Sequence, residues 1–415
     1  MSKAGLFLPP SNVPGATAGL IRIVFMIDRV VSDAGGTENQ LLKLIRGLSR
    51  EKLEIHLVCL EKSDWLDRNI DNVGCPTQVI DVNRFKNPAT YINILRLTRL
   101  LRRLDPDIVH TFFPVGNILG VLAARLAGVP RLISSRRDYG EWMSRRYLWA
   151  TRFANRFVDA IVTNSQEVQL LTARMEGMPL DRIRILWNGI DLKPFMDFEP
   201  DEDLRRSLGI EPGKRVVGLV ANLRPMKRHE TFIAAAREIL RQRQDVEFVL
   251  VGAEMKGRRA QLEALAKSFG VHTHFHFLGV RSDVPRLLSI MDVGVNCSQG
   301  EGLSNAVMEY MAARVPCIVA NSGGNPDLIT RDVTGAMFEL DDCNGLANGI
   351  LRLLDDPRRA SELARNARRR IEAEMSLPAM LAAHERFYEE LAGARAHRAS
   401  GSVNVVRHQP PQLRS

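Results

Sequence analysis

The sequence predicts an α/β protein built from two Rossmann-like, doubly wound domains that face a central cleft. Strand-like and helix-like segments alternate nearly throughout the 415 residues, a pattern typical of βαβ units with parallel sheets covered on both faces. The alternation is interrupted once, by a stretch rich in proline and acidic residues at about 194–214. Because a chain of this length is too long for one ordinary core, we expect two domains joined near residue 200.

The first half carries short apolar runs separated by longer amphipathic segments. Short runs rich in β-branched residues and bounded by turns favour strands, and longer segments with apolar residues at helical spacing favour helices. We expect strands at 21–27, 53–60, 77–82, 107–113, 131–135, 159–165 and 183–191. We expect helices at 39–50, 88–104, 115–128 and 141–157.

The second half repeats this pattern after the interruption. We expect strands at 214–223, 246–252, 273–279, 292–298, 316–320 and 335–340. We expect a helix at 229–243, a second one that follows the strand at 246–252 and ends at about 270, and two more at 283–290 and 304–313. Two terminal helices are expected at about 344–354 and 357–393. In open parallel sheets ligands bind beyond the carboxyl ends of the strands, so the cleft between the two domains is the expected site.

Composition and cysteine usage indicate a globular protein of the cytosol. Apolar residues make up 45% of the chain and charged residues 25%, and the five cysteines are scattered without a CxxC pair, so we expect reduced thiols. No apolar stretch is long enough to predict a transmembrane helix. Residues 1–19 are broken by proline and glycine and are expected to form a disordered leader, not a signal peptide. Residues 396–415 are expected to form a disordered basic tail.

Positive charge is concentrated in the first half. Residues 84–156 contain fourteen lysines and arginines against four aspartates and glutamates, whereas the chain from residue 196 onward is nearly neutral. This surplus predicts an anionic partner, such as a membrane surface, a lipid phosphate or a nucleic acid, or else a solvated basic face. Because no nucleic-acid-binding module is recognised, we expect no nucleic acid partner.

One segment of this basic region, residues 140–157, mixes aromatic and basic side chains. Its aromatic and large apolar residues are Trp142, Leu148, Trp149, Phe153 and Phe157, and its arginines are Arg145, Arg146, Arg152 and Arg156. Helical spacing places the aromatic residues largely on one side, which fits a helix lying in a membrane interface. A helix that faces the core explains the same spacing, and both interpretations remain open.

The segment 292–313 combines a buried strand, a glycine-rich turn and a helix that starts near Ser304. The first backbone N–H groups of that helix, at Leu303, Ser304 and Asn305, are unpaired and carry partial positive charge. Glycine at position 302 lets the backbone approach a ligand closely. The sequence therefore predicts a phosphate-binding site at this helix start.

Two glutamates flank the same helix start. Asn305 and Glu309 are four residues apart and share one helix face, so Glu309 can reach past a bound diphosphate towards a ribose diol. Glu301 stands in the turn on the other side of the helix start. The simpler alternative is that Glu301 complements the helix dipole and Glu309 is solvated.

A second strand–turn–helix element, residues 219–230, carries Arg224 and Lys227 at its mouth. A diphosphate leaving group needs cations to take up the charge that develops on departure. Charges at a helix start are also common on protein surfaces, so this element is weak evidence alone. Together with the segment 292–313 it indicates a diphosphate-binding site.

Together these motifs resemble the retaining GT-B-fold glycosyltransferases of family 4. The string "EGLSNAVME" matches the E-x7-E motif of that family, "PCIVANSGGNPDLI" matches the Gly-Gly segment after it, and "FLGVRSDV" matches a nucleotide-facing turn. In the first half, "DAGGTENQLLKL" is similar to the Gly-rich loop of the family and "RILWNGID" to its interdomain strand. The resemblance covers about residues 20–390 and is specific, because five motifs occur in the right order.

The resemblance implies a division of the chain. Residues 20–195 would form an acceptor-binding domain and residues 196–378 a domain that binds a nucleotide sugar. Residues 379–395 would form a terminal helix that packs back on the N-terminal domain. The resemblance further implies a hexosyltransferase that takes sugar from a UDP-, GDP- or ADP-sugar to a glycan or lipid-linked acceptor in cell-surface polysaccharide or glycolipid synthesis.

The resemblance also implies roles for individual residues. Glu309 would bind the ribose, Glu301 the sugar ring near the reacting carbon, and Arg224 and Lys227 the diphosphate. The other residues expected on the donor side are Gly302, Leu303, Ser304, Asn305, Asn222, Arg281, beside the base, and Gly252. Those expected on the acceptor or cleft side are Gly35, Gly36, His110 and Arg137.

Two positions depart from the family pattern. Asn222 stands where the family usually has an arginine, so Arg224 is the candidate substitute. Arg136 or Arg137 stands where the family often has a histidine near the donor sugar, and an arginine there could not act as a base. His110, at the end of the strand at 107–113, is either a site residue or a strand-end packing residue.

The mechanism implied by the resemblance needs no cofactor. The leaving diphosphate would accept the proton of the acceptor on the same face, and the protein would contribute positioning and charge stabilisation. No DxD-type acid pair flanks the cleft elements, so no metal is expected. Two alternatives stay open: a nucleotide-sugar epimerase of the same fold, and a nucleotide-sugar-binding protein without catalysis. We expect a cytoplasmic protein, with peripheral attachment to the inner face of the membrane under the interfacial interpretation.

Overall fold

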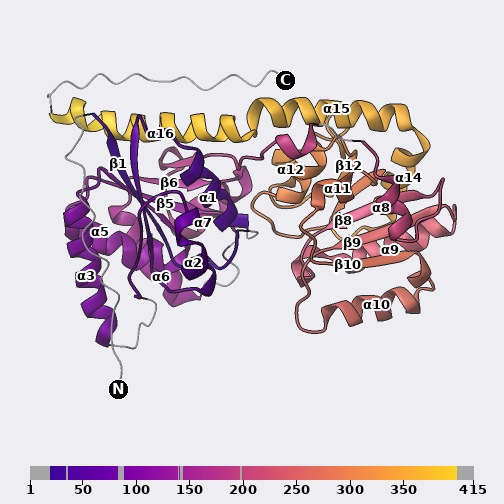
Figure 1. Ribbon diagram of the computed structural model, residues 1–415, viewed down its shortest axis with the longest axis horizontal. Coiled ribbons are helices and arrows are strands. Elements are labelled where there is room, and N and C mark those ends of the chain that lie inside the picture. Colours follow the sequence, from indigo (N-terminus) through magenta and orange to yellow (C-terminus); the bar gives the residue numbers. More distant parts are fainter. Residues whose placement is uncertain are drawn as a thin grey trace.

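The computed structural model describes residues 19–33, 36–82, 88–138, 140, 144–196 and 199–399, with only the backbone of residues 88–89 and 394–399. The expected leader, apart from Gly19, lies outside this range. Of the tail expected at 396–415, residues 400–415 also lie outside it, whereas 396–399 are helical and not disordered as predicted. The described chain forms two domains side by side, which two consecutive C-terminal helices span along one edge (Figure 1). Each domain has one parallel sheet. The prediction of two Rossmann-like α/β domains is confirmed.

The N-terminal domain is built on a seven-stranded sheet with the order β3-β2-β1-β4-β5-β6-β7. Its strands are β1 (Ile21–Ile27), β2 (Leu53–Cys59), β3 (Thr77–Val79), β4 (Ile108–Phe112), β5 (Arg131–Arg136), β6 (Ala160–Thr163) and β7 (Ile183–Ile185). Its main helices are α1 (Gly36–Gly47), α2 (Asp64–Asn69), α3 (Pro88–Leu104), α4 (Phe113–Val115), α5 (Val121–Ala127), α6 (Arg145–Ala154) and α7 (Gln166–Glu176). A π-helical turn at Gly116–Gly120 joins α4 to α5, and 3-10 turns lie at Ile70–Asn72, Asn155–Phe157, Leu180–Arg182 and Lys193–Phe195.

The C-terminal domain is built on a six-stranded sheet with the order β10-β9-β8-β11-β12-β13. Its strands are β8 (Arg215–Val220), β9 (Val246–Val251), β10 (Phe275–Gly279), β11 (Val293–Asn296), β12 (Cys317–Ala320) and β13 (Ala336–Phe338). Its helices are α8 (Glu202–Ser207), α9 (His229–Leu240), α10 (Arg258–Ser268), α11 (Val284–Leu288), α12 (Asn305–Ala312), α13 (Asn325–Leu328), α14 (Cys343–Asp355) and α15 (Pro357–Glu374). Two 3-10 turns complete the domain, η6 (Pro225–Lys227) and η7 (His272–His274).

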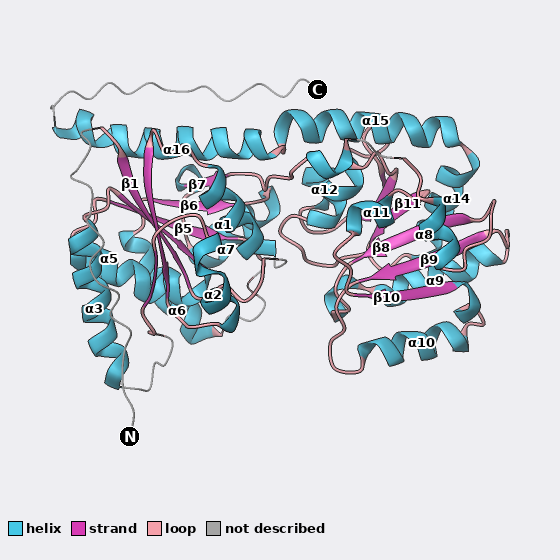
Figure 2. Ribbon diagram, viewed as in Figure 1, coloured by secondary structure: helices cyan, strands magenta, loops and turns pink. Residues whose placement is uncertain are grey.

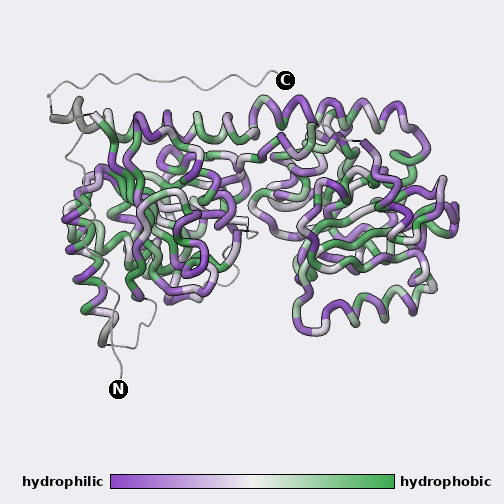
Figure 3. The backbone as a smooth tube through the Cα atoms, viewed as in Figure 1, coloured by the Kyte–Doolittle hydropathy of each residue, from purple (hydrophilic) through white to green (hydrophobic). Residues whose placement is uncertain are grey.

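Helices cover both faces of each sheet (Figure 2). In the N-terminal domain, the apolar residues of α1 and α2 pack on one face of the sheet and those of α3, α5 and α6 pack on the other. Hydrophobic residues accordingly gather in the strands and on the inner sides of the helices, while α15 is largely hydrophilic on its outer side (Figure 3). The strands β4 and β9 are buried along their whole length, as expected for central strands of a parallel sheet.

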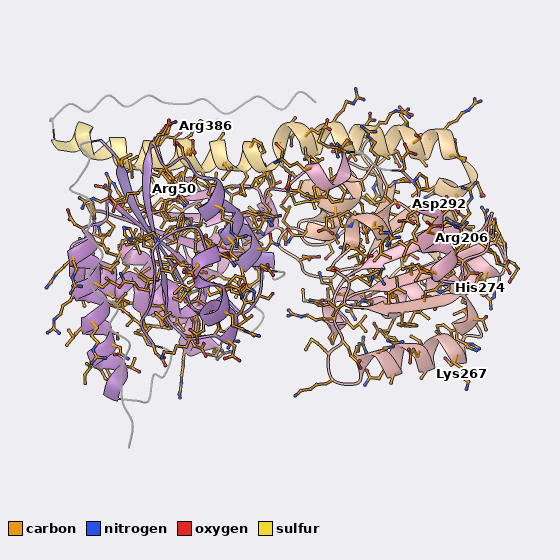
Figure 4. The ribbon with its side chains drawn as sticks, in the orientation of Figure 1. Arg50, Arg206, Lys267, His274, Asp292 and Arg386 are labelled. Carbon is orange, nitrogen blue, oxygen red and sulfur yellow. The ribbon has the colours of Figure 1, made fainter. Side chains whose placement is uncertain are left out.

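The carboxyl ends of the C-terminal strands point towards the N-terminal domain. Asp292 and His274, which precede β11 and β10, lie at the side of the molecule away from that domain (Figure 4). Since the sheet is parallel, all of its carboxyl ends lie at the opposite edge. In both sheets the strand order reverses beside the first strand of the domain, between β1 and β4 and between β8 and β11. Such switch points are where doubly wound sheets bind ligands.

The chain returns to the N-terminal domain through its last helix, α16 (Leu377–Ala399). The predicted single helix at 357–393 is wrong, because α15 ends at Glu374 and α16 begins at Leu377. Between them Ser376 forms a parallel bridge with Ile190, in which Ile190 N–H donates to the Met375 carbonyl and Leu377 N–H to the Ile190 carbonyl. These backbone groups are thus taken out of the helical ladder, which explains the break.

Three further helices of six or more residues were not predicted from the sequence. The helices α2 and α7 follow strands directly and start on serine caps, Ser63 and Ser165, whose side chains accept from the third residue of each helix. The helix α8 lies inside the polar stretch that was interpreted as a linker, and starts on Asp201. In each case the capping residue marks the helix in the sequence more clearly than a period of apolar residues does.

The packing of α16 on the N-terminal domain generates a stability prediction. Tyr388 is fully buried, and its hydroxyl lies 2.9 Å from Nδ1 of His110. Removing a large buried side chain leaves a cavity, so Tyr388→Ala should lower the free energy of unfolding by about 3–5 kcal/mol. Arg386, on the outer side of the same helix (Figure 4), is the matched control, and Arg386→Ala should change it by less than about 0.5 kcal/mol. Urea denaturation of both variants decides the matter, and equal midpoints would refute the packing role.

Candidate active site

The loop between β11 and α12 carries four of the predicted site residues, Glu301, Gly302, Leu303 and Ser304, and polar side chains hold it in place. Asn296, the last residue of β11, accepts from Ser298 N–H at 3.0 Å through Oδ1. Its amide group donates to Ser304 Oγ at 3.0 Å. Ser304 in turn caps α12 by accepting from Val307 N–H. The buried Ser304 oxygen therefore already accepts two hydrogen bonds from the protein.

Glu301 pairs with Lys227 across this loop. Lys227 Nζ lies 2.6 Å from Glu301 Oε1, while Glu301 Oε2 is buried and has no hydrogen-bond partner. Burial by itself raises the pKa of Glu301, but the charge and hydrogen bond of Lys227, together with the polar groups of Ser298 and Asn296, outweigh it and hold that pKa below its usual value. The turn η6 reaches the loop because Gln299 N–H donates to the Met226 carbonyl at 2.8 Å. The structure thus brings the two predicted residues together as an ion pair.

Glu309, two turns further along α12, has the opposite electrostatics. Burial raises its pKa to about 7, and the positive charge of Lys43 opposes this shift. Lys43 lies on α1 of the other domain and donates to the Gly189 carbonyl at 3.5 Å. Two acids eight residues apart therefore differ in ionisation: Glu301 is held as a carboxylate, whereas Glu309 is poised to gain or lose a proton near neutral pH.

The start of α12 contacts the N-terminal domain directly. Asn305 Oδ1 lies 3.4 Å from Gln40 Nε2 on α1 and 3.3 Å from Asn188 Nδ2 in the interdomain segment. Gln40 also exchanges two hydrogen bonds with the backbone of Gly189, at 2.9 and 3.1 Å. A Cβ atom on Gly36 would lie 3.7 Å from the Asn305 amide nitrogen. Gly36 is thus beside the predicted phosphate-binding helix, while Gly35 lies outside the described residues.

Gly302 lies close against the N-terminal domain. A Cβ atom at this position would lie 2.4 Å from the Arg137 carbonyl oxygen and 2.8 Å from Asn164 Oδ1, so only glycine fits. A Cβ atom on Gly324 would in turn meet the Gly302 carbonyl oxygen at 1.8 Å. Two glycines therefore let the 297–304 loop sit between the second Gly-Gly turn and the strand ends of the N-terminal domain.

Arg137 enters this junction from the end of β5. Its Nη1 donates to Asn188 Oδ1 at 2.7 Å, its guanidinium lies 5.5 Å from the centre of the Phe112 ring, and its Nε has no partner. Burial lowers its pKa to about 10, so Arg137 remains a cation at neutral pH. The side chain is a fixed positive charge beside the 297–304 loop.

The structure places the other predicted donor-side residues around one edge of the C-terminal sheet. Asn222 Oδ1 accepts from Ala253 N–H at 3.0 Å. A Cβ atom on Gly252 would lie 2.1 Å from the Ala221 carbonyl oxygen. The turns that follow β8 and β9 can therefore pack together only with glycine at position 252. Arg281 pairs with Asp283, with Nη2–Oδ2 at 2.6 Å. Arg224 is exposed and forms no ion pair with any described residue.

His110 lies inside the N-terminal domain, away from the 297–304 loop. It is fully buried, with Nδ1 at 2.9 Å from the Tyr388 hydroxyl and Nε2 at 2.8 Å from Ser135 Oγ, and it stacks on Phe112. Burial, together with the charge of Arg137, lowers its pKa well below the usual value. Both ring nitrogens already have partners, so His110 packs inside the domain, in the middle of β4 and not at its end as predicted.

A small pocket opens beside Arg137 at the carboxyl ends of β4 and β5. Phe112, Phe113 and Arg137 line one side, and Thr172 and Glu176 of α7 line another. Phe113 has φ +62°, in the left-handed region that bulky residues avoid, and such strain is concentrated at functional sites.

An ion-paired network forms another part of this pocket. The Glu176 carboxylate accepts two hydrogen bonds from Arg136, at 2.7 and 2.9 Å. It also accepts one from Asn155 at 2.6 Å. The pocket lies on the side of the site that the N-terminal domain provides.

Several residues in the junction escaped the sequence interpretation. They are Gln40, Lys43, Asn164, Asn188 and Asp327, of which Asp327 Oδ2 accepts from Gln166 N–H at 2.6 Å. Gln40 and Lys43 follow the Gly-rich loop at helical spacing from Gly36, which is a signal that could have been used. The others stand at strand ends and turns, and their proximity depends on how the two domains meet.

Neither a metal-binding cluster nor a membrane-spanning helix is found among the described residues. No group of three His, Cys, Asp or Glu side chains is placed to share a metal ion there. Among the described helices, none combines the length and the apolar character that a membrane crossing requires.

The two halves of the chain match two different family descriptions. Residues 34–194 match the family described as Glycosyltransferase Family 4, and residues 200–370 match the family described as Glycosyl transferases group 1.

The chain is also similar to bacterial enzymes along most of its length. It is 28% identical, over 76% of this chain and 87% of the relative, to a UDP-Gal:alpha-D-GlcNAc-diphosphoundecaprenol alpha-1,3-galactosyltransferase of Escherichia coli. It is 26% identical to a GDP-mannose-dependent alpha-mannosyltransferase of Mycobacterium tuberculosis, over 84% of this chain and 92% of the relative.

Solved structures share the two-domain architecture. HepE from Anabaena in complex with UDP aligns with a TM-score of 0.79 and 20% identity, over 89% of this chain and 100% of that one. A glycosyltransferase from Rickettsia africae aligns with a TM-score of 0.80 and 17% identity, over 90% of this chain and 98% of that one. At this level of identity the likeness concerns the fold.

The opposite environments of the two glutamates generate a pH prediction. A carboxyl group whose pKa is raised on folding contributes stability below its unfolded pKa and loses it as pH rises through the folded value. The wild type should therefore lose up to about 3 kcal/mol of unfolding free energy relative to Glu309→Gln between pH 4.5 and pH 8, at about 1.36 kcal/mol per pKa unit.

Glu301→Gln is the matched control, because the pKa of Glu301 is lowered. The pH dependence of the stability difference should have the opposite sign: the wild type should lose unfolding free energy relative to Glu301→Gln as pH falls below about 4.5. Urea denaturation at several pH values measures both differences. Parallel pH profiles for the wild type and Glu309→Gln would contradict the raised pKa.

Proposed function

Because the chain belongs to the GT-B-fold glycosyltransferases of family 4, we propose that it moves a hexose-type sugar from a nucleotide-diphosphate sugar to a lipid-linked or glycan acceptor with retention. The observation that carries this proposal is the Lys227–Glu301 pair, 2.6 Å long, at the start of α12 and facing the other domain. A cation and a helix N-terminus side by side suit a departing diphosphate. The carboxylate beside them suits the hydroxyls of the transferred sugar.

The donor would lie along α12. Its ribose hydroxyls would bind Glu309, its diphosphate would meet the backbone at Gly302, Leu303 and Ser304, and its sugar would lie against Glu301. HepE, one of the structural neighbours, was crystallised with UDP, which supports a nucleotide ligand in this fold. Binding of a ribose diol favours the ionised Glu309, so donor binding would be coupled to the loss of one proton near neutral pH.

The chemistry would rest on positioning and charge. As the bond between the sugar carbon and the diphosphate oxygen breaks, negative charge grows on that oxygen, and Lys227 together with the start of α12 stabilises it. The same oxygen then takes the proton of the acceptor hydroxyl as the new bond forms on the same face. This route asks for neither a protein nucleophile nor a metal ion, and it fits an arginine at position 137, which cannot act as a base.

The acceptor would enter from the N-terminal domain. The pocket between β4, β5 and α7 opens beside Arg137 and Thr37, on the side facing the 297–304 loop. The relative from Escherichia coli acts, by its name, on a sugar linked to diphosphoundecaprenol. A relative from Campylobacter jejuni, 24% identical, carries a similar description. These relatives support a lipid-linked acceptor in cell-surface polysaccharide synthesis.

The surface beside that pocket supports contact with an anionic membrane. Trp149 on α6 is 75% exposed and Phe153 is 45% exposed, with exposed Arg145 and Arg146 nearby. The buried side of α6 carries Thr151 and Ala154 instead, so Trp149 and Phe153 do not serve the core. Of the other aromatic residues predicted for this segment, Phe157 packs against the core and Trp142 lies outside the described residues. A cytoplasmic protein docked by this basic, aromatic surface to the inner face of the membrane would meet a lipid-linked acceptor where it resides.

The proposed role of Lys227 generates a kinetic prediction. Transfer should first be assayed with UDP-, GDP- and ADP-sugars, which also separates transfer from epimerisation or binding alone. With the best donor at saturation, Lys227→Ala should lower turnover by about 10²–10³, the range for removing one preorganised donor of charge stabilisation. Donor affinity should change much less, because the interaction strengthens in the transition state.

Lys214→Ala is the control for this experiment. Lys214 is also a lysine of the C-terminal domain and lies 3.7 Å from Glu247, but it precedes β8 at the amino end of the sheet. This variant should keep the turnover of the wild type. If Lys227→Ala turned over normally and only its KM rose, the lysine would bind the ground state and transition state alike, and the charge-stabilising role would be lost.

Membrane contact generates a separate prediction. Co-sedimentation with vesicles containing anionic lipid should fall steeply with added salt, because exposed charges are screened within about 8 Å at physiological ionic strength. The double change Arg145→Glu and Arg146→Glu should abolish it. The pair Arg365→Glu and Arg369→Glu, on exposed positions of α15, should not. Binding that ignores both salt and the α6 reversal would exclude this surface.

A further inference from the structure

Asn164 has a buried side-chain oxygen whose hydrogen bonds are not made. It follows β6 directly, it is 3% exposed, and its Oδ1 has no hydrogen-bond partner. A buried side-chain carbonyl oxygen without a partner is costly, so its persistence at this position calls for a ligand that completes it.

The residues that follow Asn164 in the β6–α7 turn have hydrogen-bond partners. Ser165 accepts from Val168 N–H at 3.2 Å and thereby caps α7. Gln166 N–H donates to Asp327 Oδ2 of the C-terminal domain at 2.6 Å. A Cβ atom on Gly324 would lie 3.1 Å from Ser165 Cβ. The β6–α7 turn is therefore docked on the C-terminal domain, and Asn164 is its unpaired member.

The direction of the Asn164 side chain is fixed by Gly302. Asn164 Oδ1 lies 2.8 Å from the position that a Cβ atom on Gly302 would take. The next residue towards the N-terminus is Glu301, whose Oε2 is also buried and without a partner. Two unpaired polar atoms from different domains thus flank the same loop, while Glu301 Oε1 is held by Lys227.

We infer that Asn164 is a specificity-determining residue, whose amide hydrogen-bonds hydroxyl groups of the transferred sugar opposite Glu301. This inference rests on the proposed function. A sugar hydroxyl both donates and accepts, as a carboxamide does, so the amide can read one pattern of hydroxyl groups and leave another pattern unpaired. An amide also adds no charge beside the departing diphosphate. The N-terminal domain would thereby take part in choosing the donor.

The test compares donors that differ at one hydroxyl. For the wild type, Asn164→Ala and Asn164→Asp, kcat/KM is measured with UDP-glucose against UDP-galactose and with UDP-GlcNAc against UDP-GalNAc, and UDP affinity is measured by calorimetry. Asn164→Ala should lower kcat/KM for the preferred donor about 10–100-fold and reduce the preference within its epimer pair at least about fivefold. The affinity for UDP alone should stay within about twofold, because the amide touches only the sugar.

Thr163→Val is the matched control. Thr163 is buried one position earlier, and its hydroxyl bonds the Ser165 carbonyl at 3.4 Å, inside the turn. This variant should keep the donor preference of the wild type. If Asn164→Ala is poorly folded by thermal denaturation, Asn164→Ser takes its place, since a single hydroxyl cannot reproduce the amide.

The outcomes separate the two proposals. An active Asn164→Ala enzyme with the epimer preference of the wild type overturns the inference alone. So does a loss of UDP affinity as large as the loss of kcat/KM, which would mark a structural role for the amide. A wild type that transfers sugar from none of the UDP-, GDP- and ADP-sugars overturns the proposed function itself.

Discussion

The arrangement of this site depends on one close approach, that of the Gly302 backbone to the carbonyl oxygen of Arg137. A side chain at position 302 would begin 2.4 Å from that oxygen, so the contact forms only with glycine. Once it forms, the β6–α7 turn reaches the C-terminal domain and Asp327 accepts from Gln166 N–H. Asn305 can likewise meet Gln40 and Asn188. The cleft is therefore shaped by backbone packing first and by polar contacts second.

The two glutamates show how one short segment supports two electrostatic tasks. Both side chains are half-buried, and burial alone raises the pKa of both. Lys227 lies within hydrogen-bond distance of Glu301 and reverses the effect there, whereas Lys43 acts on Glu309 from the other domain and only weakens it. The difference arises from distance: a contact ion pair offsets desolvation, and a more remote charge does so in part. Opening the cleft would remove Lys43 and leave Lys227 in place.

The fold was predictable because hydrophobic periodicity is a local property of the sequence. Site residues were predictable only where they lie within one such local element. Periodicity located nearly all strands, and the spacing of Glu301, Glu309 and Lys227 identified them within single strand–turn–helix elements. Asn164 and Lys43 carry no such local signal, since their importance comes from the partner domain. Even the break at Ser376 was hidden, because it is made by a bridge to Ile190 about 190 residues away in sequence. Contacts between distant segments are what a single sequence conceals.

That same bridge explains how the chain links its two domains. The chain passes between the domains twice, once near Ile190 and once at Ser376, and the two passages are hydrogen-bonded to each other. They lie along one edge of the molecule, where α15 meets α16 (Figure 1). Because α15 packs with the C-terminal core and α16 with the N-terminal core, any opening of the cleft must pivot at this pair. The contacts at Gly302, Asn305 and Asp327 would then separate while both sheets stay intact, which makes the junction the part of the structure that a bound donor can stabilise most.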